Sequence, residues 1–421
     1  MLDIKYIREN PDLIKKACVD KRFNADIDQL LVTDKQMQEL RLELEALQNK
    51  RNTTSKAIGK AKPEEREALK AEVAAIKPKM EELNHTLHQL QETFEQYMLE
   101  VPAPQRNDVP VGKDEKDNIE IKQWGSKPSF DFKAKNHIEL GEALGIIDLE
   151  RGVKIAGSRS YVLKGDGARL EQAILRFSID KLIRKGYTLM QVPMLVSEHA
   201  MVGTGYFPNG RDQAYCVEKD KMALAGTSEV PMVSYYGNEI LKEAELPIRM
   251  CAQTTCYRRE AGAAGRDTYG FYRVHQFQKI EQVIFAPADE DISVQLHDEL
   301  LQNAEEIMQD LGLHYRVVYV CSGDLGQGQI RKHDIETWMP SRNSYGETHS
   351  CSTFHDFQAR RMKIRYKDKN GKNIICYTLN NTAFASPRGM IPVIENYQQA
   401  DGRIMIPEAL RPYMDDQTYI G

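Results

Sequence analysis

The chain has 421 residues, 41% of them hydrophobic and 28% charged, a composition typical of soluble globular proteins and unlike that of disordered or membrane chains. This length predicts about two or three domains. The formal net charge is −5, so a nucleic-acid partner has to bind a local basic patch rather than the field of the whole protein. No apolar run approaches the roughly 20 residues of a membrane helix, and the N-terminus lacks a secretory signal pattern. We therefore expect a cytoplasmic protein with no membrane partner.

The seven cysteines are an odd number scattered along the chain, which favours reduced thiols over a disulfide framework. Only Cys251 and Cys256 are close together, at a spacing that fits the first half of a zinc site. No second pair of His or Cys follows at matching spacing, so we expect buried thiols and no zinc.

A helical hairpin is predicted over residues 27–98. Apolar residues recur there at heptad spacing in two interleaved series, the pattern of a coiled-coil seam. Gly59 and Pro63 mark the turn between two helices of about 30 residues, each extending roughly 45 Å at ~1.5 Å per residue. The second helix carries the series Leu69, Ile76, Leu83, Leu90, Tyr97 and Val73, Met80, Leu87, Phe94. The first carries Leu30, Met37, Leu44 with Leu40, Leu47, and its pattern fades near Thr53.

A group of basic residues lies near the turn of this hairpin, with no acidic residue among them. They are Lys50, Arg51, Lys56, Lys60 and Lys62. Such a cluster can bind the phosphates of a nucleic acid. The pattern fits a solvated coiled-coil tip or a dimerisation rod equally well. The proline-containing stretch 101–118 predicts a linker, and we divide the chain into an N-terminal domain, residues 1–108, and a second domain, residues 109–421.

The second domain mixes helical and strand patterns. Helical periodicity at 170–185 and 292–311 alternates with short β-rich runs, without a regular βαβ rhythm. The runs cover residues 316–321, 362–366 and 374–379, and strands also cluster around 251–285. This predicts an α+β fold on a mainly antiparallel sheet. Neither a Walker sequence nor GxGxxG after a strand is present, so a bound nucleotide needs another device.

The segment CYRREAGAAGRDTYGFYRVHQFQKIEQ, residues 256–282, has the features of a nucleotide site. On a strand, Arg258 and Glu260 project from one face, where a guanidinium binds phosphate and a carboxylate accepts from an amino group such as that of adenine. Gly262, Gly265 and Gly270 then predict a mobile loop that closes over a ligand.

Beyond that loop, a second strand places cation, aromatic ring and anion on one face. The residues are Arg273, His275, Phe277, Lys279 and Glu281. This order suits a triphosphate, a stacked base and a small polar substrate. The alternative is a solvent-facing hairpin whose exposed face is charged.

The segment resembles motif 2 of class II aminoacyl-tRNA synthetases, and its RxEAGxxGRDTxG and RxHQFxKxE patterns are similar to those of the seryl-tRNA synthetases. The N-terminus MLDIKYIRENPDLIKKA, the hairpin, and GYTLMQVPMLV at residues 186–196 resemble segments of that family in the same order. The last is similar to motif 1, which implies a homodimer. The resemblance implies a tRNA-binding coiled-coil arm followed by a class II catalytic domain.

The resemblance also implies a serine–tRNA ligase that activates L-serine with ATP and transfers the seryl group to tRNA(Ser), and to tRNA(Sec) where it is present. Serine would bind to Thr227, Ser228, Glu229, Arg258, Glu281 and Thr382, with Thr227 and Glu229 on the amino group and Glu281 on the hydroxyl. Thr227 or Ser228 as a helix N-cap is compatible with this role. Thr382 stands in NNTA, where many family members have NGSG, and its hydroxyl takes the place of the family's serine.

ATP would bind to Arg258, Arg259, Glu260, Arg273, Val274, Phe277, Glu347, Thr348, His349, Ser350 and Arg388. Glu347 and Ser350, in a segment that resembles the family's ExxSCS, would ligate Mg²⁺ through oxygen. Arg258 and Arg388 would be catalytic, stabilising charge while the serine carboxylate attacks the α-phosphorus, without a covalent enzyme intermediate. Lys50, Arg51, Lys56, Lys60 and Lys62 would then contact tRNA. Two rivals are an amino-acid ligase that loads a carrier protein and an inactive RNA-binding scaffold.

Overall fold

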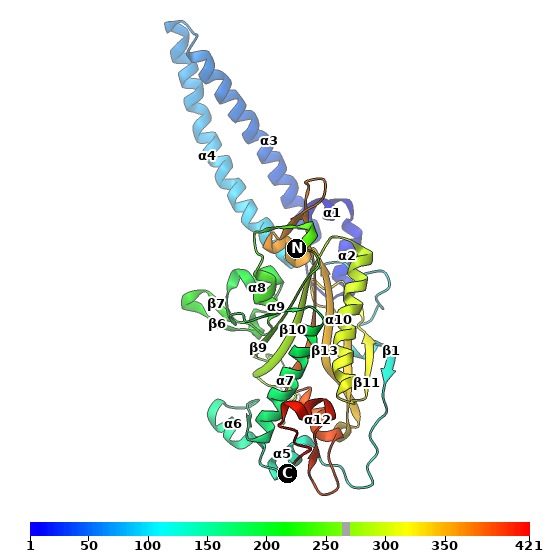
Figure 1. Ribbon diagram of the computed structural model, residues 1–421. Helices are drawn as coiled ribbons and strands as arrows, with labels where there is room; N and C mark the ends of the chain where they lie inside the picture. Colours follow the sequence, from blue (N-terminus) through cyan, green and yellow to red (C-terminus); the bar gives the residue numbers. More distant parts are fainter. Residues whose placement is uncertain (263–269) are drawn as a thin grey trace. The chain divides into compact units, whose positions relative to one another are not determined.

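The computed structural model describes residues 1–262 and 270–421 (Figure 1). Gly265 of the predicted closing loop therefore lies outside the described residues. The chain forms two compact units, Leu2–Pro102 and Ala103–Gly421, the second of which also includes Met1. No helix of the described residues has both the length and the apolar composition to cross a membrane.

The N-terminal unit consists of helices α1 Ile4–Glu9, α2 Pro11–Asp20, α3 Ile27–Ile58 and α4 Pro63–Glu100. Asp26 caps α3 by accepting a hydrogen bond from the Gln29 N–H, and Pro63 begins α4, where its missing N–H has no helical partner to lose. The predicted hairpin and its turn are thereby confirmed. Arg8 of α1 forms an ion pair of 2.6 Å with Asp34, which fixes α1 to the base of α3.

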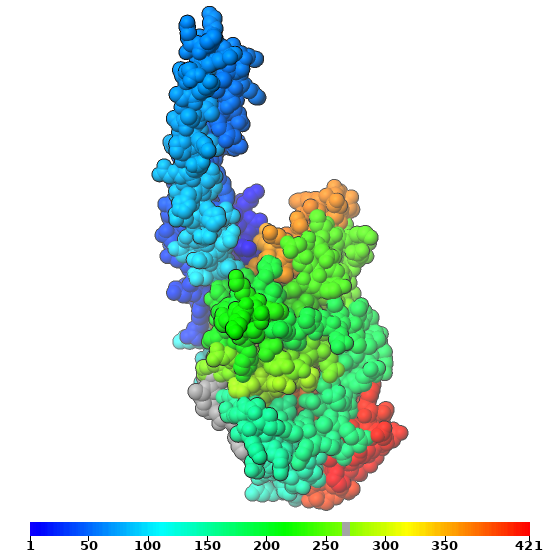
Figure 2. All heavy atoms as spheres, turned by 90° about the vertical axis from the view of Figure 1, so that its left-hand side faces the viewer, coloured from blue at the N-terminus to red at the C-terminus, as the bar shows by residue number. Residues whose placement is uncertain are grey.

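The coiled-coil seam extends further toward the turn than the apolar pattern predicts. Arg51 and Ile58 follow Leu44 at heptad spacing, and Thr54 follows Leu47; Thr54 is buried, while Arg51 and Ile58 are half-buried. The apolar pattern fades near Thr53 but the seam continues, because Thr54 and Arg51 occupy seam positions that an apolar pattern does not count. Figure 2 shows the side chains of the two helices in contact at this end.

The second unit is built on an eight-stranded sheet with the order β1-β11-β12-β13-β16-β10-β9-β4. Every neighbouring pair is antiparallel except β4 and β9, which confirms the predicted α+β class. In that order the strands are Ile119–Trp124, Tyr315–Tyr319, Arg331–Met339, Ser344–His355, Tyr377–Ser386, Gln276–Ala286, Ile248–Tyr257 and Thr188–Met190.

One face of this sheet packs against two long helices and a short one. α7 Asp166–Arg184, α10 Glu290–Asp310 and α12 Met390–Asn396 bury their apolar faces there (Figure 1). Ile280 and Ile284 of β10 point into this core and are fully buried. The next residues along β10 therefore point to the opposite face, because successive side chains of a strand alternate.

The opposite face is covered partly by short helices, α8 Glu198–Thr204, α9 Glu229–Ser234 and α11 Phe357–Met362. Met232 and Met362 pack there on Val283 and Phe285 of β10. The rest of this face borders the cavity described below. Residues at the middle and ends of β10, β12, β13 and β16 line that cavity.

The remaining elements are short. Helices α5 His137–Ala143 and α6 Leu149–Ala156 precede α7. Four small sheets join β2 Ile147–Asp148 to β3 Val162–Leu163, β5 Leu195–Ser197 to β7 Met222–Leu224 and β6 Tyr215–Val217, β8 Ile240–Lys242 to β14 Arg365–Lys367 and β15 Asn373–Ile375, and β17 Ile404–Met405 to β18 Tyr419–Ile420.

Two predictions about local structure are wrong. The strand expected at 362–366 is β14 alone, because Met362 ends α11 and Lys363 adopts a left-handed conformation with φ 55°. The stretch 101–118 is not a free linker. The Ala103 N–H donates to the Gln327 carbonyl, and Val109 is buried against the second unit's own core.

Candidate active site

A cavity of about 280 Å³ opens on the sheet face opposite α7 and α10. Phe277, Lys279 and Glu281, at alternate positions of β10, point into it as the strand period requires. Thr382 of β16 stands directly opposite Glu281, next to a bulge between the two strands. The alternation predicted for this part of β10 is therefore confirmed.

The structure brings most predicted site residues together in this cavity. They are Glu229, Arg258, Glu260, Arg273, Val274, Phe277, Glu281, Glu347, Thr348, His349, Ser350, Thr382 and Arg388. Thr227 and Ser228 are fully buried behind its wall. Arg259 does not line the cavity; it lies in a separate surface recess with Tyr215 and Glu218.

The route by which some of these residues reach the cavity differs from the prediction. β9 ends at Tyr257, so Arg258 and Glu260 do not lie on a strand, and Glu260 adopts a left-handed conformation with φ 53°. Arg273 and His275 precede β10, which begins at Gln276. The turns on either side of the two strands, rather than strand alternation, direct Arg258, Glu260 and Arg273 into the cavity.

Several lining residues were not assigned a role from the sequence. They include Tyr206, Tyr272, Lys279, Gln329, Lys332, Ser352 and Asn380. Lys279 and Lys332 belong to alternating patterns of charged residues along their strands, and this pattern is the sequence signal that indicates their place on the cavity face. Tyr206 follows α8 in a turn, where nothing in the spacing of the sequence indicates that it reaches the cavity.

At one end of the cavity, which we call the acidic end, Thr227, Glu229, Lys279 and Glu281 form a buried cluster. Lys279 forms an ion pair with Glu281 and donates a hydrogen bond of 2.7 Å from Nζ to Thr227 Oγ1. The side chains of Lys279 and Glu281 are 7% and 3% exposed. Buried charges are stable only when they are paired in this way.

Glu229 is held by neutral donors. Its carboxylate accepts from Tyr206 Oη at 2.9 Å and from Gln358 Nε2 at 2.6 Å, and Thr378 donates in turn to the Gln358 amide oxygen. Burial and the charge of Glu281 raise the pKa of Glu229 to about 7, against the opposing effects of Gln358, Lys279 and Tyr206. The cluster thus holds more acid than base, and a ligand cation relieves that imbalance.

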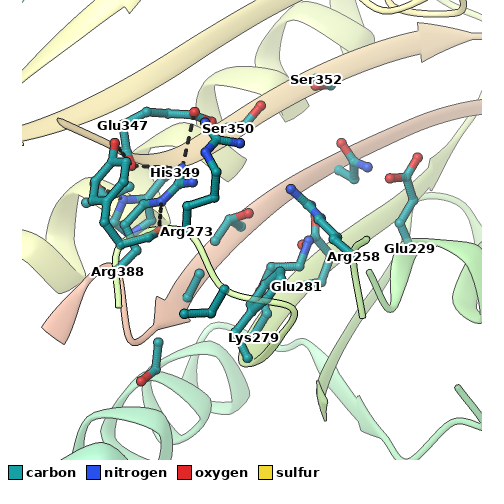
Figure 3. Close-up of a pocket in the computed structure, with 18 of the residues that line it drawn as sticks. Glu229, Arg258, Arg273, Lys279, Glu281, Glu347, His349, Ser350, Ser352 and Arg388 are labelled. Atoms are coloured by element: carbon teal, nitrogen blue, oxygen red, sulfur yellow. Dashed lines mark hydrogen bonds and ion pairs between the residues drawn. The ribbon is translucent and has the colours of Figure 1, made fainter. Parts of the chain in front are cut away.

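At the other end, which we call the arginine-rich end, Arg273, Arg388 and Glu347 converge. Arg388 donates to the Tyr272 carbonyl at 3.2 Å, to the Glu347 carboxylate at 3.3 Å, and lies over the Tyr272 ring at 4.4 Å. Arg273 forms an ion pair of 2.6 Å with Glu260. Desolvation opposes ionisation of Glu347, but Arg388 and nearby cations hold its pKa below the usual value. In Figure 3 these residues lie at some distance from Glu229, Lys279 and Glu281.

Two further groups complete the walls. Lys332 lines the arginine-rich end and forms an ion pair of 3.0 Å with Asp334, whose pKa burial raises to about 7. Arg258 donates to the Gly226 carbonyl, and its guanidinium lies 5.3 Å from the centre of the Phe277 ring. Phe277 presents an aromatic face to the cavity, and the Arg258 guanidinium presents a pair of donors that can bind a phosphate or a carboxylate.

The basic residues of the arm are not equivalent. Lys50 forms an ion pair of 2.8 Å with Glu72 of α4, and Arg51 occupies a seam position. Lys56, Lys60 and Lys62 are exposed around the turn between the two helices. These three are the residues of the cluster that are most open to a polyanion.

Residues 215–397 match the family model of the tRNA synthetase class II core domain (G, H, P, S and T). The antiparallel sheet and its charged cavity are thus those of a class II aminoacyl-tRNA synthetase. A solved prolyl-tRNA synthetase from Giardia lamblia, at 16% identity and a TM-score of 0.59, shares the fold over 66% of this chain and 56% of its own.

Residues 1–104 match the model of the seryl-tRNA synthetase N-terminal domain. The chain is 43% identical to the serine–tRNA ligase of Deinococcus radiodurans, over 100% of this chain and 99% of that one. It is similar to the seryl-tRNA synthetase of Pyrococcus horikoshii solved with ATP, at 35% identity, a TM-score of 0.93 and coverage of 100% and 99%. A serine–tRNA ligase from Naegleria fowleri solved with AMP is 30% identical to this chain, with a TM-score of 0.88 and coverage of 100% of this chain and 98% of that one. The chain belongs to the seryl-tRNA synthetase family.

Proposed function

We propose that this protein activates L-serine with ATP, giving seryl-adenylate and pyrophosphate, and then transfers the seryl group to tRNA(Ser), and to tRNA(Sec) where that tRNA is present. The observation that carries the proposal is the division of one cavity into an acidic end and an arginine-rich end. A small zwitterion fits the first, and a polyphosphate fits the second. The relatives solved with ATP and AMP support the same nucleotide.

We assign serine to the acidic end. The Glu229 carboxylate takes the ammonium, and the Thr227 hydroxyl accepts from the Glu229 N–H at the start of α9 behind it, next to the buried Ser228. Glu281 accepts from the hydroxyl, with Thr382 beside it on the neighbouring strand. Arg258, at the same end in Figure 3, takes the substrate carboxylate.

We assign ATP to the rest of the cavity. The adenine stacks on Phe277 beside Val274, and its amino group donates to Glu260, of which one oxygen accepts from Arg273. Thr348 and His349 complete this wall. His349 is neutral at pH 7, because burial lowers its pKa to about 4. Arg259 stands outside the cavity, so we assign it only to the outer rim.

Glu347 and Ser350 suit a magnesium ion. Both present oxygen to the cavity, and Glu347 is held in its ionised form. Mg²⁺ commonly takes one or two protein oxygens and completes its shell with phosphates and water. When bound, it supplies charge neutralisation of the phosphates.

Catalysis then requires alignment more than side-chain chemistry. The serine carboxylate attacks the α-phosphorus and pyrophosphate leaves, so no enzyme nucleophile is needed. Arg258 and Arg388 donate to the oxygens on which negative charge increases in the transition state. The mostly polar cavity holds the two reactants in line.

We assign tRNA binding to residues 1–108 through the hairpin and catalysis to residues 109–421. Lys56, Lys60 and Lys62 are the first phosphate contacts, with Lys50 and Arg51 behind them. A homodimer fits the segment around β4, an edge strand on which Leu189 is 45% exposed, and Leu195 at the start of the following strand β5 is 43% exposed. The cytoplasm is the compartment where these substrates meet.

Serine-dependent exchange of pyrophosphate into ATP tests the activation step. We expect exchange with serine and at least about 10²-fold lower kcat/KM with alanine or glycine, since a polar-lined site rejects analogues that leave its groups unpaired. Threonine also has a hydroxyl, so the shape of the pocket has to exclude its extra methyl group. Absence of exchange with serine would refute the specificity proposed here.

Deletion of residues 37–87 tests the arm. We expect tRNA charging to be lost while exchange is retained, because the cavity is built entirely from the other unit. Equal loss of both activities would mean that the hairpin serves only stability.

A further inference from the structure

Lys279 is the least expected residue of the acidic end. A serine pocket needs acceptors for an ammonium and a hydroxyl, and a lysine offers neither. Its ammonium is nonetheless buried between the two acids of the cluster, in contact with Glu281 and 2.7 Å from Thr227 Oγ1. A buried ion pair seldom stabilises a fold more than apolar side chains of the same volume. Stability therefore does not account for this lysine.

Lys279 also connects the two carboxylates mechanically. Thr227 Oγ1, which accepts from Lys279, also accepts from the backbone N–H of Glu229 at 3.2 Å. The lysine thus contacts Glu281 directly and reaches the first residue of α9 through a single hydroxyl. These contacts fix the position of Glu281 on β10 relative to that of Glu229 on α9.

The chemical consequence concerns hydrogen-bond polarity. An ammonium in contact favours the carboxylate over the carboxylic acid, and a carboxylate is only an acceptor. Glu281 then demands a donor from the ligand. Without the lysine, both acids would compete for the ligand's ammonium, and a ligand without a hydroxyl would satisfy them as well as serine does.

We propose that Lys279 is a positioning residue that selects for a hydroxyl-bearing amino acid, by contacting the Glu281 carboxylate so that it accepts from the ligand and by tying it through Thr227 to Glu229. This inference rests on the proposed function and deepens it, since it concerns how the same site tells serine from alanine. Lys279 itself needs no contact with the substrate.

The test compares serine with alanine in pyrophosphate exchange by the full-length protein. For Lys279→Met we expect kcat/KM with serine to fall about 100-fold, mainly through KM, while the value with alanine changes less than about threefold, so that discrimination collapses. KM for ATP should stay within about twofold, because the nucleotide lies at the other end.

Lys279→Gln is the second variant, in case a buried methionine prevents folding. It retains a donor for Thr227 but lacks the charge, so it should lose the same discrimination. Lys279→Arg retains the charge and should recover part of it. The matched control is Lys332→Met, which removes another cavity lysine with a carboxylate partner. It should alter KM for ATP and leave the ratio of serine to alanine unchanged.

Equal losses with serine and alanine in the Lys279 variants, or an unchanged ratio, would overturn the inference. So would a Lys279→Arg variant that discriminates no better than Lys279→Gln. Failure of the proposed function is a distinct result, because it would appear in the unmodified protein as absence of exchange with serine.

Discussion

The two ends of the cavity hold their charged groups in different ways. At the acidic end Lys279 and Glu281 are almost completely buried, and their partners are other side chains. At the arginine-rich end, the side chains of Arg273, Arg388 and Glu347 are 29%, 22% and 45% exposed, and Arg388 bonds partly to backbone carbonyls. A small ligand therefore meets a fixed set of partners at the first end. A polyphosphate at the second end can replace the ion pairs that Arg273 and Arg388 each form with one carboxylate.

The largest effect is expected at the arginine-rich end. Arg388→Ala should lower kcat of serine-dependent exchange by about 10²–10³-fold, because it removes a donor to charge that increases in the transition state. Equilibrium binding of serine should hardly change. The control is Arg342→Ala, since Arg342 also lies 4.4 Å over the Tyr272 ring but does not line the cavity. A comparable loss in the control would show that the Tyr272 stack, and not the cavity cation, matters.

The next effect belongs to the acidic end. Glu281→Ala should reduce the preference for serine over alanine by about 10–100-fold, as expected when an acceptor for a substrate hydroxyl is lost. The Michaelis constant for serine should rise much more than that for ATP. Glu347→Ala should show the reverse pattern. If both variants changed the two constants in parallel, the division of the cavity into two ends would be wrong.

Sequence patterns predict the parts of this site that repeat along a strand or helix. The alternation of Phe277, Lys279 and Glu281 on β10 and the heptads of the arm follow from the periods of two and seven residues. Glu260 is different, because its direction depends on a turn with positive φ. Tyr206 and Gln358 contact Glu229 from segments 23 and 129 residues away in the chain. Such pairing depends on tertiary packing, and no local spacing encodes it.

A smaller effect is expected from pH. Since the pKa of Glu229 is about 7 and the ionised form takes the substrate ammonium, kcat/KM for serine should level off above about pH 8, be about half of that plateau near pH 7, and fall up to tenfold per unit at lower pH. Glu281, Lys279, Tyr206 and Gln358 are the groups around it.

The pKa of Asp334, at the arginine-rich end, is also raised to about 7, so it is the necessary control. Asp334→Asn should leave the acidic limb of the serine profile in place. Glu229→Gln should abolish that limb and lower the plateau. If the fall at low pH disappeared in the Asp334 variant instead, the titrating group would be Asp334 at the arginine-rich end, and the prediction for Glu229 would be wrong.

The smallest effect tests how Glu229 is held. Tyr206 donates to its carboxylate and lowers its pKa, so Tyr206→Phe should move the limb upward by about 0.5–1 pH unit, the equivalent of one ordinary hydrogen bond. At pH 7 this shift corresponds to a loss of about threefold in kcat/KM for serine, and near pH 8.5 the loss should vanish. Tyr235→Phe, which removes an exposed hydroxyl outside the cavity, should leave the profile unchanged. A loss in Tyr206→Phe that is the same at every pH would mean that Tyr206 contacts the substrate rather than tuning Glu229.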